Sequence, residues 1–224
     1  MSEVMSSGDL PFEDRLAAAR RLALALAGYR GRNPLVLAIP RGAIGMGRVI
    51  AEALEGELDV VLVRKLRAPF NRELALGAVD EAGAVVMSDS ASRLGVDESY
   101  LADEARAQLE RIRERRARYG GDEFRIDPAG RLVIVIDDGL ATGATMVSAL
   151  RSLRALGASE IVAAVPVGAV DSVARVRGEA DAVVCLATPE PFFAVSQFYR
   201  DFPQVEDDEV VAELKAWRAA RSGT

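Results

Sequence analysis

Five short runs of almost uninterrupted apolar residues alternate with helix-like segments along this chain of 224 residues. They are PLVLAIP (34–40), LDVVLVRKL (58–66), the start of RLVIVIDDGLATGATMVSALRSLRALGAS (131–159), EIVAAVPVGA (160–169) and DAVVCLA (181–187). A strand that is apolar on both faces belongs in a covered sheet, and helices between such strands favour parallel pairing with right-handed crossovers. We therefore expect an α/β fold, with a doubly wound, mainly parallel five-stranded sheet flanked by helices.

The segments around these runs complete one predicted domain, residues 1–224, with its core at about 30–187. An N-terminal helix is expected over 11–28, with these apolar positions on one face: Phe12, Leu16, Ala19, Ala23 and Leu26. An aromatic-rich stretch and a closing helix form a small C-terminal hood at 188–221. A lid, a hairpin and a long helix are expected to occupy 65–118.

Within that last segment, residues 67–89 mix Pro, Asn, Gly and acids with two short apolar runs. This pattern is typical of a mobile loop that leads into a small hairpin. Asp97 is a plausible N-cap for a long helix over 98–118. Its inward positions are predicted to be Leu101, Ala105, Leu109 and Ile112.

Composition narrows the classes of function. Lys and Arg total 28 against 34 Asp and Glu, and a net charge of −6 disfavours nucleic-acid and membrane-surface partners. The chain has no histidine, which removes mechanisms that need a histidine base or a histidine-bound metal. The single Cys185 leaves no intrachain disulfide and is typical of a small buried hydrophobe. Because the sequence also shows no signal peptide or membrane span, we predict a cytoplasmic protein.

The strongest local signal is VIVIDDGLATGATM, residues 133–146. A buried strand delivers Asp137 and Asp138 at its carboxyl end, where open α/β sheets bind ligands. The turn then enters a helix through Thr142 and Gly143, so that backbone N–H groups and hydroxyls can form a phosphate cradle. The carboxylates would repel a bare phosphate but can accept hydrogen bonds from sugar hydroxyls. A phosphorylated sugar satisfies both halves of the motif.

A purely structural interpretation remains open, in which two acids end a strand and Thr142 caps a helix. The combination of two acids with Thr-Gly-x-Thr on one strand, turn and helix is much rarer than either part. The stretch lacks Walker A spacing, and no Gly-x-Gly-x-x-Gly follows a strand.

The stretch resembles the phosphoribosyl pyrophosphate (PRPP) signature of the type I phosphoribosyltransferases. The resemblance implies that fold, with a lid and a hood, and a binding set for the ribose and 5′-phosphate: Asp137, Asp138, Gly139, Ala141, Thr142, Gly143, Ala144 and Thr145. It implies that pyrophosphate is bound by the turn after the first sheet strand and by the lid, through Arg41, Gly42, Arg64, Lys65 and Arg67. The catalytic set would be Asp137, Asp138, Arg64 and Lys65. Arg41 and Gly42 could also be parts of a plain strand-to-helix turn.

The hood would select the acceptor base, and Phe192 and Phe193 are candidates to stack on a ring, although an aromatic cluster there could equally be hood core. One departure matters. Ala141 stands where the hypoxanthine and guanine enzymes have an Asp that is proposed to exchange a proton with the base. The Leu-Ala-Thr-Gly form looks more like the adenine and orotate branches, so the acceptor stays open between a purine, a pyrimidine and another amine.

The resemblance implies a magnesium-dependent transferase of nucleotide and nucleoside metabolism, which moves the phosphoribosyl group from PRPP to a nitrogen nucleophile and releases pyrophosphate. Mg²⁺ would be held by Asp137 and Asp138 through water. The expected partners are PRPP and a small-molecule acceptor, without nucleic acid or membrane, in a homodimer. Two alternatives remain: a catalytically silent PRPP-sensing regulatory protein, and a different sugar-phosphate enzyme, for which no nucleotide loop is found.

Overall fold

A computed structural model describes residues 10–87 and 96–222. The chain divides into two compact units. The first, called the sheet unit below, combines Met1–Val61 with Arg125–Thr224, and the second, called the hairpin unit, is Leu62–Phe124.

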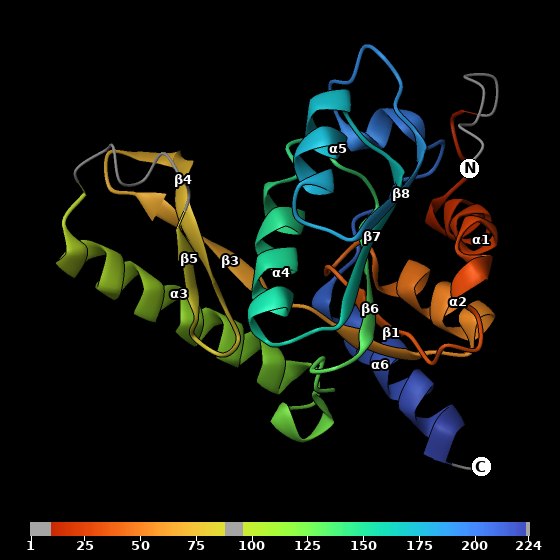
Figure 1. Cartoon of the computed structure of the whole chain (residues 1–224), viewed down its shortest axis with the longest axis horizontal. Helices are drawn as coiled ribbons and strands as arrows, with labels where there is room; N and C mark the ends of the chain where they lie inside the picture. Colours follow the sequence, from red (N-terminus) through yellow and green to blue (C-terminus); the bar gives the residue numbers. More distant parts are fainter. Residues whose placement is uncertain (1–9, 88–95, 223–224) are drawn as a thin grey trace. The chain divides into compact units, whose positions relative to one another are not determined.

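The sheet unit is built on five parallel strands in the order β2-β1-β6-β7-β8 (Figure 1). Their bounds are β1 Leu35–Ala38, β2 Glu57–Val60, β6 Leu132–Ile136, β7 Glu160–Val167 and β8 Ala182–Ala187. Every residue of β1 and of the central β6 is buried, as expected for strands that are covered on both faces. The predicted parallel α/β sheet is therefore confirmed.

Helices cover both faces of this sheet. α4 and α5 lie on one side, and α1 and α2 lie on the other (Figure 1). α6 packs on α2 and β2. The bounds are α1 Arg15–Ala25, α2 Ile44–Leu54, α4 Ala144–Ala155, α5 Val170–Arg177 and α6 Asp207–Ser222, with short 3₁₀ turns at Ala27–Tyr29 and Val195–Phe198. This arrangement places the N-termini of α2 and α4 just after β1 and β6, respectively.

The N-terminal helix is shorter than predicted, because the Asp14 side chain accepts the Ala17 N–H at 2.6 Å and starts the helix at Arg15. Phe12 precedes the helix and forms a bridge with Tyr199 in the hood. Leu16 is exposed rather than buried. The buried face instead comprises Ala18, Ala19, Leu22, Ala23 and Leu26.

The apolar run 58–66 is not one strand, which corrects the prediction. Its first part lies in β2, whereas Val63–Ala68 forms β3 of a separate antiparallel sheet in the order β3-β4-β5. The other two strands are β4 Asn71–Asp80 and β5 Val85–Met87. Both parts of the run are apolar because each buries side chains in its own core. The sequence pattern therefore does not show where one sheet ends and the other begins. The last residues of the predicted hairpin, 88–89, lie outside the described residues.

The hairpin unit is completed by α3 (Glu98–Arg118), which packs on β3 and β4, and by a 3₁₀ turn at Asp122–Phe124. The predicted N-cap is confirmed, since the Asp97 side chain accepts the Ser99 N–H at 2.8 Å. Of the four predicted inward positions only Ile112 is fully buried. Arg116 is also buried, and its Nε and Nη2 donate to the two carboxylate oxygens of Glu81 at 2.7 and 2.9 Å.

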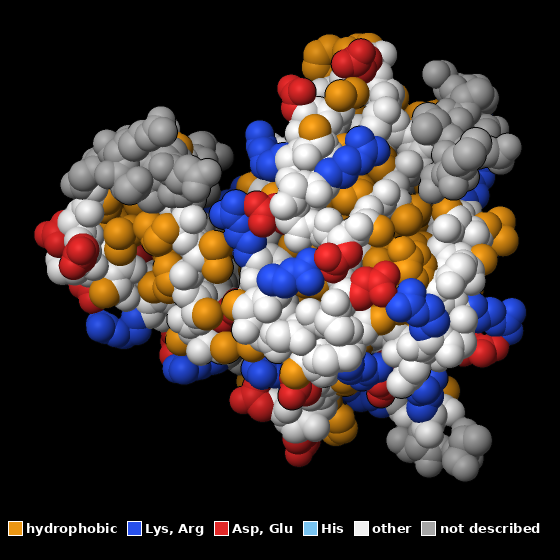
Figure 2. Space-filling model, in the orientation of Figure 1, with side chains coloured by type: hydrophobic (Ala, Val, Ile, Leu, Met, Phe, Trp, Pro, Cys, Tyr) orange, Lys and Arg blue, Asp and Glu red, His pale blue; other side chains and the backbone are white. Residues whose placement is uncertain are grey.

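Charge is mixed on the surface. On the face drawn in Figure 2, basic side chains alternate with acidic ones. Among the described residues, no helix is both long and apolar enough to cross a membrane.

Candidate functional site

The two aspartates that follow β6 lie at the carboxyl edge of the parallel sheet. Asp137 accepts the backbone N–H of Asp138 through Oδ1 at 2.9 Å. The Oδ2 atom of Asp138 accepts the Nε–H of Arg15 from α1, also at 2.9 Å. The hydroxyl of Tyr199 donates to the Asp138 carbonyl at 2.7 Å. The pair is therefore held from two sides, by the N-terminal helix and by the hood.

The surroundings of Asp137 change the pKa of its carboxyl. Burial, and then the neighbouring charge of Asp138, raise the pKa of Asp137 well above its ordinary range. The backbone hydrogen bond from Asp138 and the charge of Arg15 oppose that shift. Burial destabilises the anionic form of this carboxyl. Hydrogen-bond donors that arrive with a ligand would stabilise it, and sugar hydroxyls are such donors.

The turn from Gly139 to Gly143 leads into α4. Gly143 is the N-cap at φ 70°, a left-handed conformation that favours glycine, and it has no side chain to cap the first turn. The loop is fastened from α5, where Ser172 donates to the Ala141 carbonyl and Arg175 to the Thr142 carbonyl, each at 2.7 Å. Ala141 and Thr142 are exposed. The Ala144 N–H makes only a long hydrogen bond, 3.5 Å, to the Thr142 hydroxyl oxygen. The N–H groups at this end of α4 can therefore receive an anion.

The turn after β1 reaches the same aspartate. The Pro40–Arg41 peptide bond is cis. A Cβ built on Gly42 would lie 2.3 Å from Oδ2 of Asp138, so only glycine lets the turn approach the carboxylate this closely. The Arg41 guanidinium pairs with Glu206, which precedes α6, at 2.7 Å.

Arg15 is the residue that the sequence analysis missed. Its Nη1 donates to the Pro203 carbonyl at 2.7 Å, and its guanidinium lies 3.6 Å from the ring centre of Phe202. An arginine near a helix start carries no sequence signal for a partner 123 residues away. The contact requires α1, β6 and the hood to meet, which only the tertiary structure shows.

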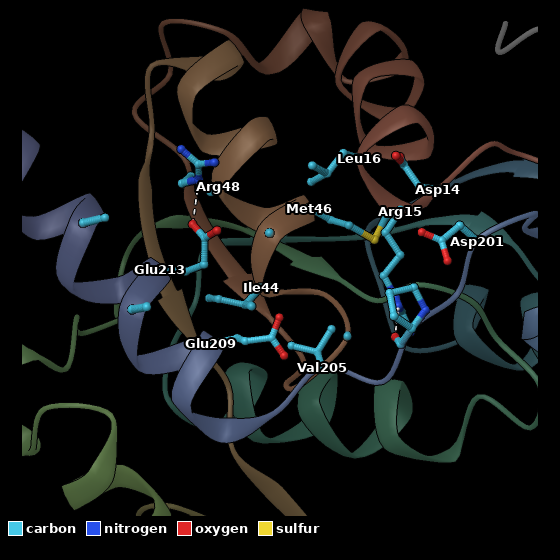
Figure 3. A pocket seen from close by; sticks show the side chains of 15 residues that line it. Asp14, Arg15, Leu16, Ile44, Met46, Arg48, Asp201, Val205, Glu209 and Glu213 are labelled. Carbon is cyan, nitrogen blue, oxygen red and sulfur yellow. Dashed lines mark hydrogen bonds and ion pairs between the residues drawn. The ribbon is translucent and has the colours of Figure 1, made fainter.

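A cavity of about 600 Å³ opens beside Arg15 and Gly42, between α1, α2, α6 and the segment before α6 (Figure 3). Its lining combines apolar side chains with the carboxylates of Asp14, Asp201, Glu209 and Glu213. Arg48, on the same wall, pairs with Glu213 at 2.7 Å. Both arginines that line the cavity are thus engaged by the protein.

Comparison with known proteins decides the family. The family model described as "Phosphoribosyl transferase domain" matches residues 12–203, which include the aspartate pair, the cradle and the Arg41 turn. This chain belongs to the phosphoribosyl transferase family.

Curated relatives agree with this family assignment. A Mycobacterium tuberculosis protein named as a phosphoribosyl transferase is 46% identical over 204 residues, which are 91% of this chain and 46% of that protein. This chain thus spans about half the length of those curated relatives. A ribose-phosphate pyrophosphokinase of Methanopyrus kandleri is 30% identical over 160 residues, 67% of this chain and 45% of that enzyme.

A solved structure shares the whole fold. The crystal structure of the protein TT1426 from Thermus thermophilus is 43% identical, with a TM-score of 0.85 over 93% of this chain and 99% of that one. This similarity confirms the fold of this chain, including its parallel five-stranded sheet.

The basic residues predicted for the lid lie on a strand. Arg64, Lys65 and Arg67 all belong to β3 in the hairpin unit, so the segment expected as a lid from residue 65 begins on a strand. The reason is the split of the run 58–66, because a strand begins where a loop was expected to start. Their role toward pyrophosphate stays a prediction.

The hood aromatics divide into two groups. Phe198 and Tyr199 are buried, and Phe192 contacts Phe198 with ring centres 4.8 Å apart, so these three build hood core. Phe193 is 84% exposed, and its backbone N–H donates to Gln197. Of the two candidates for base recognition, Phe193 is the one whose ring is free to meet a ligand, and that role also stays a prediction.

Proposed function

We propose that this phosphoribosyl transferase moves the 5-phosphoribosyl group from PRPP to a nitrogen nucleophile and releases pyrophosphate. The observation that carries the proposal is the convergence at Asp138 of the strand β6, the Gly42 turn and Arg15, directly before the open N-terminus of α4. This convergence puts three kinds of group next to one another. They are carboxylates for a ribose, N–H groups for a phosphate and a basic turn for pyrophosphate.

The 5′-phosphate would lie on the first turn of α4, bound by N–H groups and hydroxyls from Thr142 to Thr145. Asp137 and Asp138 would accept hydrogen bonds from the ribose hydroxyls. As the bond from the anomeric carbon to pyrophosphate breaks and the bond to the acceptor nitrogen forms, positive charge builds on the sugar. The nearby carboxylates stabilise that charge, and the proton of the acceptor nitrogen passes to solvent water as the new bond completes.

Pyrophosphate would leave toward the Arg41 turn, with Arg64, Lys65 and Arg67 as the proposed further cations. In the present conformation Arg41 is paired with Glu206. Binding of pyrophosphate must therefore exchange one anionic partner of Arg41 for another, and the exposed position of this ion pair makes the exchange inexpensive.

Magnesium is part of the proposal, with Asp137 and Asp138 holding it through water. Their oxygens are the hard ligands that Mg²⁺ prefers. Among the described residues no group of three or more His, Cys, Asp or Glu side chains could hold a metal ion, so the substrate's own oxygens would have to complete the shell. Bound there, Mg²⁺ would neutralise charge on the departing pyrophosphate.

A nucleobase is the proposed acceptor, with Phe193 exposed in the hood to stack on it. Ala141 is exposed at the place of the acid that is proposed for proton exchange in part of the family, so that relay is not available from this position. We also propose a cytoplasmic homodimer acting in nucleotide metabolism.

Calorimetry and a product assay test the proposal together. PRPP is titrated into the full chain with Mg²⁺, and pyrophosphate release is then measured with a panel of purine and pyrimidine bases. The variant Asp137→Asn with Thr142→Ala should lose PRPP binding at least a hundredfold and keep its fold. Thr188→Ala, which changes an exposed threonine after β8, serves as the matched control. Wild-type affinity in the double variant would overturn the proposed site.

The same assay separates the alternatives. Binding with base-dependent release identifies the transferase and its acceptor. Tight binding without release across the panel would favour a PRPP sensor instead. Formation of PRPP from ribose 5-phosphate and ATP would point to the chemistry named for the Methanopyrus relative.

A further inference from the structure

Arg15 links the aspartate pair to the hood. Its Nε donates to Oδ2 of Asp138 at 2.9 Å, and its Nη1 donates to the Pro203 carbonyl at 2.7 Å. Its guanidinium also lies 3.6 Å from the ring centre of Phe202. One arginine at the start of α1 therefore contacts both the acid that follows β6 and the segment that precedes α6.

Neighbouring groups restrict this ion pair from two directions. The turn after β1 lies against it, because a Cβ built on Gly42 would be 3.2 Å from the Nε of Arg15. On the hood side, the rings of Phe202 and Tyr199 have their centres 4.9 Å apart, and the Tyr199 hydroxyl donates to the Asp138 carbonyl. The hood therefore holds the backbone of Asp138 directly and its side chain through Arg15.

The two oxygens of the Asp138 carboxylate have different surroundings. Oδ2 accepts the hydrogen bond from Arg15, whereas no hydrogen bond from the described residues reaches Oδ1. The side chain is 17% exposed, and Oδ1 is not fully buried. Arg15 thus fixes the carboxylate by one oxygen and leaves the other oxygen for a ligand.

The contacts of Arg15 depend on the shape of a guanidinium. This group is planar and presents its N–H donors in a rigid fork, so it can donate in two directions while its face lies on an aromatic ring. Here the two acceptors are a carboxylate and a backbone carbonyl, and the ring is that of Phe202. A lysine ammonium is a single nitrogen on a flexible stem. It would keep the charge beside Asp138 without fixing the orientation of the carboxylate.

We propose that Arg15 is a positioning residue for the ribose of the substrate, which orients Asp138 so that Oδ1 accepts a ribose hydroxyl and which makes this orientation depend on the hood. Arg15 itself does not contact the sugar. The inference rests on the proposed function, because it takes Asp138 as a ligand of the ribose. Since the hood is also the proposed site of the acceptor, Arg15 couples the binding of the two substrates.

The test compares two phosphates that differ in their hydroxyl groups. Ribose 5-phosphate carries the hydroxyls that Asp138 would bind, and tetrahydrofurfuryl phosphate keeps the ring and the phosphate without them. Calorimetry on the full chain gives the ratio of the two affinities. We expect the wild type to bind ribose 5-phosphate at least about tenfold tighter, because a hydrogen bond to a charged group has about that effect. Arg15→Gln should reduce this ratio to about threefold or less.

Further variants, each checked for its fold by circular dichroism, separate positioning from charge and from stability. Arg15→Lys keeps the charge and should still lose most of the ratio. Phe202→Leu should lower the ratio by about two- to fivefold, because it removes only the stacking contact. Two controls should keep the wild-type ratio. Arg20→Gln removes a charge from an exposed position of α1, and Leu22→Val removes one methylene group from the buried face of this helix.

The outcomes distinguish this inference from the proposed function. Equal affinities of the wild type for the two phosphates would contradict ribose binding by Asp138, and both proposals would be overturned. A wild type that prefers ribose 5-phosphate, with the same ratio in Arg15→Gln, would overturn the role of Arg15 only. The full wild-type ratio in Arg15→Lys would show that charge suffices and would overturn positioning. An unchanged ratio in Phe202→Leu would overturn the dependence on the hood.

Discussion

At the scale of single residues, Asp138 is the point on which the site converges. Its side chain touches Arg15 from α1 and the backbone of Gly42, while its carbonyl accepts Tyr199 from the hood. One residue, through its side chain and its backbone carbonyl, thus couples three segments that are far apart in the sequence. A substitution at Gly42 should therefore change ligand binding, and a substitution at Arg15 should change stability.

Gly42→Ala tests the close approach of the turn after β1 to the Asp138 carboxylate. The added methyl would lie 2.3 Å from Asp138 Oδ2, so the carboxylate or the turn must move. We expect PRPP affinity to fall at least tenfold. Gly45→Ala is the matched control, because the nearest atom to its Cβ, on Leu16, is 3.4 Å away. Equal affinities of the two variants in calorimetry would contradict the placement of the pyrophosphate turn.

Arg15→Gln tests the ion pair. The two side chains are only 13% and 17% exposed, so removal of the cation leaves a largely buried carboxylate without its partner. We expect the free energy of unfolding to fall by about 1–3 kcal/mol. Urea unfolding of Arg15→Gln, Asp138→Asn and the double variant forms a cycle, and a coupling near zero would show that the contact contributes no stability.

At the scale of elements, the hood and α6 set the state of the turn after β1. Glu206 holds the Arg41 guanidinium, and its own N–H donates to Glu209 in the first turn of α6. The start of this helix therefore competes with an incoming anion for Arg41.

Glu206→Gln should release Arg41 and raise PRPP affinity by about two- to fivefold, a modest effect because the pair is exposed. Glu52→Gln provides the control, since it removes one carboxylate that faces Arg48 on α2 and leaves Arg41 untouched. PRPP binding is measured by calorimetry. Weaker binding in Glu206→Gln would show that Glu206 contributes to PRPP binding and does not compete with it.

The edge strand β8 carries the single cysteine. The sequence predicts a buried Cys185, but the side chain is only partly buried, and its thiol donates to the Ala187 carbonyl at 3.2 Å. Burial raises the pKa of the Cys185 thiol to about 11. Because the thiolate is the reactive form, labelling by a disulfide reagent at pH 8 should be about a hundredfold slower than for an ordinary cysteine. The rate should rise about tenfold for each pH unit up to pH 10, and a flat profile would contradict the raised pKa.

At the scale of the whole molecule, the chain forms two compact units with separate cores. The hairpin unit has its own buried ion pair, in which Arg116 is 3% exposed and bonded twice to Glu81. A unit with its own core can open without the other, and hydrogen exchange reports such local opening.

Arg116→Gln should therefore lower exchange protection in 62–124 by the equivalent of about 3–5 kcal/mol, the usual cost of breaking a buried pair. Protection in β6 and β7 should stay within experimental error. Arg113→Gln, which changes an exposed arginine of the same helix, should alter neither region. Equal loss of protection in both units would show that they unfold as one.

Much of the fold follows from periodicity alone. Strands such as β6 are apolar on both faces, and helices between them leave parallel pairing as the simple arrangement. The motif 133–146 likewise predicts its strand, its turn and its helix. Prediction failed where one apolar run serves two sheets, at 58–66, because burial in either core selects the same residues. The predicted burial of Leu16 also failed, because the face of the helix that is buried depends on the elements that pack against it.

The sequence by itself determined the parallel five-stranded sheet and the resemblance to the family, because these depend on local patterns and on one short motif. Tertiary structure alone decided that Arg15 pairs with Asp138, that Glu206 holds Arg41, and that Arg116 of α3 pairs with Glu81. The physical reason is common to all three. Charges act through space over a few ångströms, and their partners lie tens of residues or more apart along the chain, where no periodic pattern connects them.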